Sequence, residues 1–183
     1  MLTGFLTSIS WLFLHYVSYY LVEASRPITV IAHMVNTPNS IRWALDQGAN
    51  GVLGEGCSAS TSVTEMTDFL GSSEIISSPL ALIYIDAKLD KTVPNYAEAG
   101  ANVVRLFNEK VLARGFRGQI LLGCLTISRA DYLRGALQEA SNTKYADQYF
   151  YTIDNEGRKA KKVLRSSLQL KTTNIVYDTG ITA

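Results

Sequence analysis

The chain has 183 residues, of which 47% are hydrophobic and 18% are charged, a composition that excludes a disordered or fibrous protein and favours a single globular domain. Seventeen Lys and Arg against sixteen Asp and Glu leave a formal net charge of +1, so no global field directs the chain to nucleic acid or to an anionic membrane. Any binding to a charged partner therefore has to be local.

The N-terminal segment 2–22 is almost free of charge and is close to the ~20 residues that span a bilayer. Val22 and Ala24 put aliphatic and small residues at the two positions that a signal peptidase reads, which predicts a signal peptide over residues 1–24 and a secreted protein. An uncleaved anchor or a buried first helix is the alternative. Export would place Cys57 and Cys124 in an oxidising compartment where they could pair, but their sequence context does not show that they are adjacent.

Beyond this segment, short runs rich in Val, Ile, Leu and Tyr alternate with segments of helical character, which is typical of βα units and a parallel sheet. The predicted strands are 28–32, 51–54, 80–85, 119–123, 148–153 and 173–177. The predicted helices are 38–47, 96–113, 129–140 and 156–165. The Ser- and Thr-rich segment 57–64 is predicted to be the least structured part of the mature chain.

Repeated βα units fit either a doubly wound sheet or a (β/α)8 TIM barrel. Without the predicted signal the chain is shorter than the ~200 to 250 residues of an ordinary eight-unit barrel. We therefore expect an α/β fold of the TIM-barrel type with about six βα units, whose sheet is open, is completed by another chain, or comes from an incomplete sequence. Open sheet edges would favour self-association.

Polar residues follow three of the predicted strands. The first strand leads into His33, the second into Glu55, and the third into Asp86 and Lys88. Ligand sites in parallel α/β folds form at the carboxyl ends of the strands, so these side chains are the candidates for chemistry. Side chains two apart on a strand share a face, and Asp86 and Lys88 should therefore point the same way.

Together these four residues predict a phosphodiester site. The carboxylates of Glu55 and Asp86 are suited to Mg²⁺, which prefers oxygen ligands and keeps waters that a substrate phosphate can replace. Lys88 would neutralise a phosphate oxygen, and His33 would act as general acid or base. Each residue also has a structural interpretation: a hydrogen-bonded histidine, a solvated turn glutamate, and an ion pair between Asp86 and Lys88 at the rim.

Six sequence blocks point to a known family: Arg-Pro-Ile at 26–28, Ala-His-Met-Val-Asn at 32–36, Gly-Ala-Asn at 48–50, Asp-Ala-Lys at 86–88, Glu-Ala-Gly at 98–100 and Asp-Thr-Gly-Ile-Thr at 178–182. In these blocks the chain resembles the sphingomyelinase D/phospholipase D enzymes of spider venoms and related arachnids, distant relatives of glycerophosphodiester phosphodiesterases. The resemblance implies a (β/α)8 barrel that uses Mg²⁺ to release choline from sphingomyelin or lysophosphatidylcholine and leaves a cyclic phosphate. It implies catalytic, metal-binding and phosphate-binding roles for His33, Asp86 and Lys88.

The chain departs from the family pattern in three places. Leu53-Gly54-Glu55 stands where the family has Glu-x-Asp, so one metal carboxylate is missing. The segment 58–62 has no histidine where the family carries its second catalytic one, and Tyr177 stands near the place of a choline-facing Trp, where it could offer a cation-π face. Two hypotheses follow: a secreted lyase of weak activity, or an inactive relic or fragment that binds lipid, a membrane surface or a protein partner.

Overall fold

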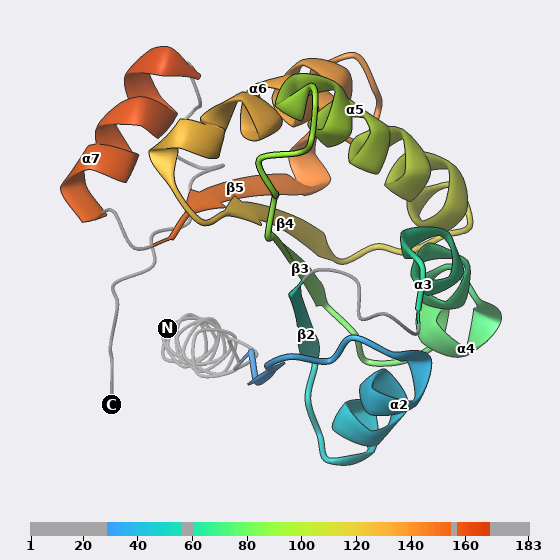
Figure 1. The fold of residues 1–183 in the computed structure, drawn as a ribbon. Helices are drawn as coiled ribbons and strands as arrows, with labels where there is room; N and C mark the ends of the chain where they lie inside the picture. The colour runs from blue at the N-terminus through green and yellow to red at the C-terminus, as the bar shows by residue number, and fades with distance from the viewer. Residues whose placement is uncertain (1–28, 56–60, 155–156, 169–183) are drawn as a thin grey trace, which may run out of the picture.

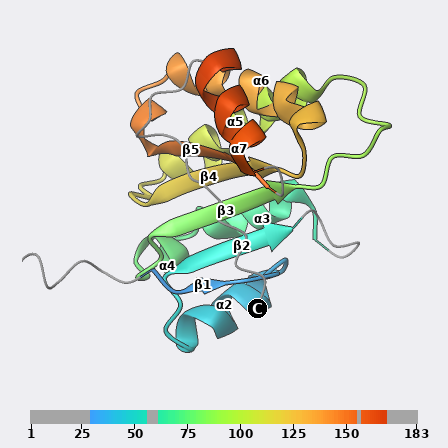
Figure 2. The same cartoon turned by 90° about the vertical axis from the view of Figure 1, so that its left-hand side faces the viewer.

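The computed structural model describes residues 29–55, 61–154 and 157–168, and these form an α/β fold around one sheet (Figure 1). The strands of this sheet are β1 (Ile31–Ala32), β2 (Gly51–Glu55), β3 (Leu82–Ala87), β4 (Gln119–Cys124) and β5 (Tyr149–Ile153). All neighbouring pairs are parallel, and the spatial order β1-β2-β3-β4-β5 repeats the sequence order (Figure 2). The described strands thus show no reversal of order of the kind that marks a doubly wound sheet, and they are compatible with part of a TIM barrel.

The helices lie around the outer side of the sheet (Figure 1). They are α2 (Pro38–Asp46), α3 (Val63–Leu70), α4 (Ser73–Ile76), α5 (Tyr96–Phe107), α6 (Ala130–Ser141) and α7 (Gly157–Lys162). Right-handed crossovers that always step in the same direction place every helix on the same face of a parallel sheet, which explains this arrangement. Within the described ranges, no helix has the length and apolar character needed to cross a membrane.

Five of the six predicted strands are confirmed, and the sixth, 173–177, lies outside the described residues. The first strand is shorter than predicted. At Val30 the amide donates to Asn50 Oδ1 at 2.7 Å, while the carbonyl oxygen accepts from the Gly51 amide of β2 at 3.1 Å. Only Ile31 and Ala32 pair with β2.

The predicted helices are also confirmed, with changed ends. The predicted helix 96–113 is α5 followed by a π-helical turn, Asn108–Leu112, and the predicted helix 156–165 is α7 followed by a π-helical turn, Val163–Ser167. Pro38 begins α2 directly after Thr37, whose hydroxyl accepts from the Ser40 amide in a capping box.

Two helices, α3 and α4, were not predicted. Their N-caps are serines: Ser62 Oγ accepts from the Glu65 amide at 3.1 Å, and Ser72 Oγ accepts from the Ile75 amide at 3.5 Å. The interpretation of 57–64 as unstructured is therefore wrong for its last two residues, which begin α3. Ser and Thr are frequent both in loops and at helix N-caps, so composition alone does not separate the two.

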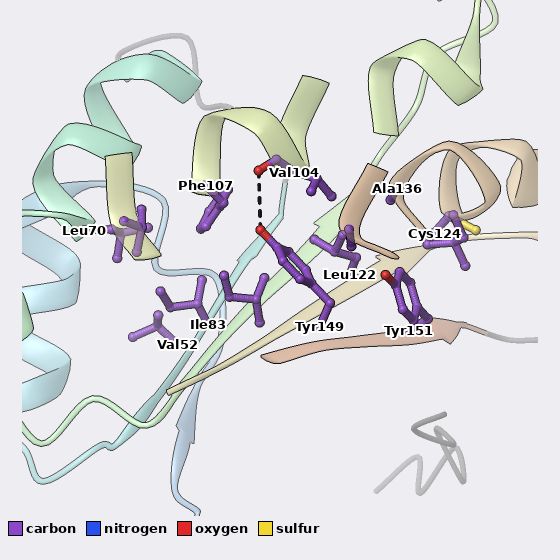
Figure 3. Close-up of a cluster of buried hydrophobic side chains, with 14 of the residues drawn as sticks. Val52, Leu70, Ile83, Val104, Phe107, Leu122, Cys124, Ala136, Tyr149 and Tyr151 are labelled. Atoms are coloured by element: carbon purple, nitrogen blue, oxygen red, sulfur yellow. Dashed lines mark hydrogen bonds between the residues drawn. The ribbon is translucent and has the colours of Figure 1, made fainter. Parts of the chain in front are cut away.

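The main core lies between the sheet and the helices. One register row of the sheet, Val52, Ile83, Ile120 and Tyr149, is buried on this face. Leu70 and Phe107 approach the same face from the helices (Figure 3). The Tyr149 hydroxyl donates a hydrogen bond to the side-chain oxygen of Asn108 at 2.9 Å and lies 3.4 Å from the backbone carbonyl oxygen of Val104. The hydroxyl of this buried ring therefore has hydrogen-bond partners.

Helices α5 and α6 pack with their backbones in contact because glycines stand at the crossing. A Cβ atom added at Gly135 would lie 1.8 Å from the carbonyl oxygen of Ala97, and one added at Gly100 would lie 1.9 Å from that of Tyr132. Such distances admit no side chain, so these two positions fix how closely α6 approaches α5.

Gly135→Ala tests this contact. We expect the substitution to lower the free energy of unfolding by about 1 to 3 kcal/mol or more, because the added methyl group forces the two helices apart. Gln138→Ala, on the exposed side of the same helix, is the control and should change stability by less than about 0.5 kcal/mol. Urea denaturation followed by circular dichroism measures both, and equal midpoints would contradict the close packing.

Candidate functional site at the carboxyl edge of the sheet

Two of the predicted site residues are register partners on neighbouring strands. Glu55 is the last residue of β2 and pairs with Asp86 of β3. Neighbouring strands lie about 4.8 Å apart. The sheet therefore brings the two carboxylate-bearing residues together at its carboxyl edge. Glu55 ends a strand, so its interpretation as a turn residue is wrong.

Asp86 and Lys88 form an ion pair. Lys88 Nζ donates to Asp86 Oδ2, and the Asp86 side chain is buried, with the residue 3% exposed, whereas the Lys88 side chain is 39% exposed. Asp86 Oδ1 is buried and has no hydrogen-bond partner. The ammonium offsets the charge of a carboxylate that has little contact with water.

His33 lies one residue beyond β1, on the same edge of the sheet, and it is exposed. The next residue, Met34, has a φ of +59°, a left-handed conformation that costs a non-glycine residue about 1 to 3 kcal/mol. A hydrogen bond from the Val35 amide to the Leu53 carbonyl oxygen, 3.1 Å long, fixes the loop to β2. The turn thus holds His33 beside the strand that ends in Glu55.

Sequence reasoning missed a second pair of polar residues, which lie on β3 and directly after β5. The Tyr84 hydroxyl donates to Asp154 Oδ1 at 2.9 Å, and this bond crosses β4. Gly123 of β4 makes the crossing possible, since a Cβ atom there would lie 2.8 Å from Tyr84 Cε2 and 2.9 Å from the Tyr84 hydroxyl oxygen. The Asp154 amide donates to the Cys124 carbonyl oxygen at 3.1 Å.

A sequence signal for Asp154 existed. It directly follows the predicted strand 148–153, which is the same position relative to its strand that singled out the residues after the first three strands. No comparable sequence signal pointed to Tyr84, because a tyrosine within an apolar run is most simply interpreted as part of the core.

The donor set for a metal ion is small. Among the side chains that the structure describes, no three His, Cys, Asp or Glu residues gather into a metal site. Mg²⁺ is commonly bound by one or two carboxylates and completes its shell with waters and substrate phosphate. The backbone register that pairs Glu55 with Asp86 brings together two carboxylate-bearing residues, the number that such a minimal site needs.

Several predictions fall on residues outside the described ranges: the signal segment 1–24, Cys57, the segment 58–62 apart from its last two residues, and Tyr177. Cys124 is fully buried, and its Sγ lies 3.5 Å from the carbonyl oxygen of Thr126. Pairing of Cys57 with Cys124 therefore stays a prediction.

Tyr84→Phe tests the bond across β4. A hydrogen bond to a charged acceptor contributes about 1.5 to 3 kcal/mol, so we expect the variant to be less stable by an amount in this range. Tyr145→Phe is a matched control, because the Tyr145 hydroxyl forms no hydrogen bond within the described residues. Chemical denaturation of both variants measures the difference; equal stabilities would show that the Tyr84 bond contributes nothing.

Comparison with known proteins adds no assignment: no family model matches this chain, and no curated protein matches it. The kinship to sphingomyelinase D enzymes accordingly stays a prediction based on the sequence blocks, beside a site defined by its own geometry.

Proposed function

We propose that the protein is a secreted phosphodiesterase of the phospholipase D type, a lyase of weak activity that releases choline from sphingomyelin or lysophosphatidylcholine. Its sheet is then part of a TIM-barrel-like domain. The observation that carries the proposal is the ion pair of Asp86 and Lys88 next to Glu55, at the edge of the sheet where parallel α/β proteins bind ligands. The sequence blocks 32–36 and 86–88 support the same assignment.

Lys88 is the residue suited to the substrate phosphate. Its ammonium is partly exposed at the edge of the sheet and is held there by a buried carboxylate. A phosphate oxygen that reaches the ammonium gains about 4 kcal/mol of Coulomb energy at 4 Å when the effective dielectric constant is about 20. When bound at Glu55 and Asp86, Mg²⁺ would supply further neutralisation of the phosphate charge.

His33 is the residue suited to proton transfer. A hydroxyl oxygen of the lipid forms a bond to phosphorus, the bond from phosphorus to the choline oxygen breaks, and His33 takes the hydroxyl proton. The departing choline oxygen takes its proton from water, because His33 is the only histidine after the predicted signal segment. A missing general acid typically lowers a rate by about 10²- to 10⁴-fold, which is the reason for a weak activity.

Binding of choline lipids without turnover is the second candidate function. It is favoured by the same ion pair, because Lys88 already neutralises Asp86 and an ammonium in that place competes with a metal ion for the carboxylate. In this case the edge of the sheet binds the lipid phosphate and no bond is broken.

Incubation of the purified protein with Mg²⁺ and lysophosphatidylcholine distinguishes the two functions. We expect choline and a cyclic phosphate, detected by a choline assay and by ³¹P NMR, with His33→Ala lowering the rate about 10²- to 10⁴-fold. Asp147→Asn, which removes an exposed carboxylate away from the site, should leave the rate unchanged. No product above that of a folded Asp86→Asn variant would overturn the catalytic proposal, and bound lipid without product would establish the second function.

Mg²⁺ binding has a readout apart from turnover. A ligand that binds only the folded state stabilises it by about 2.7 kcal/mol at a concentration 100 times its dissociation constant. We expect Mg²⁺ to raise the melting temperature of the wild-type protein and to leave that of Asp86→Asn unchanged. An equal rise in both proteins would remove Asp86 from the metal site.

A further inference from the structure

Helix α7 and the π-helical turn that follows it carry a dense group of positive charges. The segment 158–165 has no Asp or Glu, and five of its eight residues are basic: Arg158, Lys159, Lys161, Lys162 and Arg165. Short blocks of closely spaced Lys and Arg are typical of sites that bind polyanions. Because the whole chain has a formal net charge of only +1, this segment is a local positive region on a nearly neutral protein.

The apolar residues of the segment decide which side of it is turned outward. Ala160, Leu164 and Leu168 are buried and belong to the hydrophobic core, whereas the five basic side chains are exposed. Figure 1 shows α7 at one end of the row of helices that covers the sheet. Lys161 interacts with another part of the protein and is set aside. The other four residues are named the α7 stripe: Arg158, Lys159, Lys162 and Arg165.

Within the described residues, no carboxylate neutralises the α7 stripe, since none of its four side chains forms an ion pair there. Other helices differ in this respect. Arg42 of α2 pairs with Glu74 at 2.7 Å, and these two side chains belong to neighbouring helices. Arg105 of α5 pairs with Glu98 at 3.0 Å. An external anion has to displace a carboxylate at those places, whereas the α7 stripe presents cations that already face the solvent.

The form of the α7 stripe favours a narrow, linear polyanion that is bound through charge alone. From residue 158 to residue 165 the stripe is about 10 Å long at the 1.5 Å rise of a helix. The exposed large apolar residues of the described chain all lie outside 157–168, so the stripe has no aromatic ring to stack on a base and no apolar side chain to insert into a bilayer.

A planar membrane is a poorer partner than a chain for the same reason of form. It faces the surface around the stripe as well, and a protein of net charge +1 has little attraction to a charged plane beyond the Debye length of about 10 Å. A narrow chain, by contrast, contacts the stripe and little else.

We propose that the α7 stripe binds a linear sulfated polysaccharide. The guanidinium groups of Arg158 and Arg165 can each donate two parallel hydrogen bonds to a sulfate, as arginine does to phosphate, and Lys159 and Lys162 add point charges between them. This binding uses no residue of the candidate site at the carboxyl edge, breaks no bond and needs no metal ion. It therefore goes beyond the proposed catalysis and stands without it.

Isothermal titration of the full chain with a heparin octasaccharide tests the proposal. We expect binding that weakens at least tenfold between about 50 and 200 mM NaCl, because each bound cation releases counterions from a polyanion. A hyaluronan octasaccharide, which carries carboxylates and no sulfate, should bind at least tenfold more weakly than heparin. Absence of heparin binding, or equal affinity for the two saccharides, would overturn the proposal.

Two further probes test the class of the partner. These are a 20-base-pair DNA duplex and vesicles of phosphatidylcholine and phosphatidylserine in a ratio of 7 to 3. We expect both to bind more weakly than the heparin octasaccharide at equal salt. Tighter binding of the duplex would assign the stripe to nucleic acid, and tighter binding of the vesicles would assign it to a membrane; either result would overturn the polysaccharide proposal.

A triple substitution locates the binding. It replaces three cations of the stripe: Arg158→Gln, Lys162→Gln and Arg165→Gln. Because these side chains are exposed, the variant should keep the wild-type melting temperature and lose at least tenfold in heparin affinity. Unchanged affinity in the folded variant would place the polysaccharide elsewhere.

A matched control separates position from overall charge. It removes the same number of exposed cations from other parts of the protein: Lys91→Gln, Arg117→Gln and Lys144→Gln. Both triple variants have the same net charge, so a local site predicts that the control binds heparin within threefold of the wild type. An equal loss in the two variants would show that overall charge, and not the α7 stripe, causes the binding.

This proposal and the catalytic one fail separately. Choline release by a protein that does not bind heparin would overturn the polysaccharide site alone. Heparin binding that requires the α7 stripe, in a protein that releases no choline, would support the polysaccharide site while the catalytic proposal fails.

Discussion

The parallel register of β3 between β2 and β4 is the constraint on which the candidate site depends. It sets Glu55 beside Asp86 and sets Gly123 beside Asp86 on the other side. A slip of one residue in either pairing would turn the neighbouring side chain to the opposite face, because side chains alternate along a strand. The ion pair of Asp86 with Lys88 would survive such a slip, but Glu55 and Asp86 would no longer be register partners.

The same register places different kinds of side chain on the two faces of the sheet. On the helix side, the row that includes Val52 and Ile83 forms the base of the core and the floor of a cavity of about 270 Å³ that lies between the sheet and helices α3 and α5. On the other side, Tyr84 reaches across Gly123 to Asp154. Lys88, which is paired with the buried Asp86, stands at the carboxyl edge of the sheet and also lines the cavity.

The chemistry available at the edge sets a limit on the reaction. One exposed imidazole, one buried carboxylate and one ammonium are enough to bind a phosphodiester and to take up one proton, but an efficient displacement needs a second group that gives a proton to the departing oxygen. The absence of such a second group after the predicted signal segment is the reason that the proposed lyase is expected to turn over slowly.

The sequence by itself determined the α/β class, five of the described strands and the positions of His33, Asp86 and Lys88 at strand ends, because apolar runs and the polar residues that follow them are local patterns. Local composition also misled, since Ser62 and Ser72 cap helices in a region that looked irregular. Only the tertiary structure decided the strand order, the pairing of Tyr84 with Asp154 over Gly123, and the cavity below α3 and α5. These features join residues that lie far apart along the chain, and their contacts depend on register and helix packing, which no local pattern encodes.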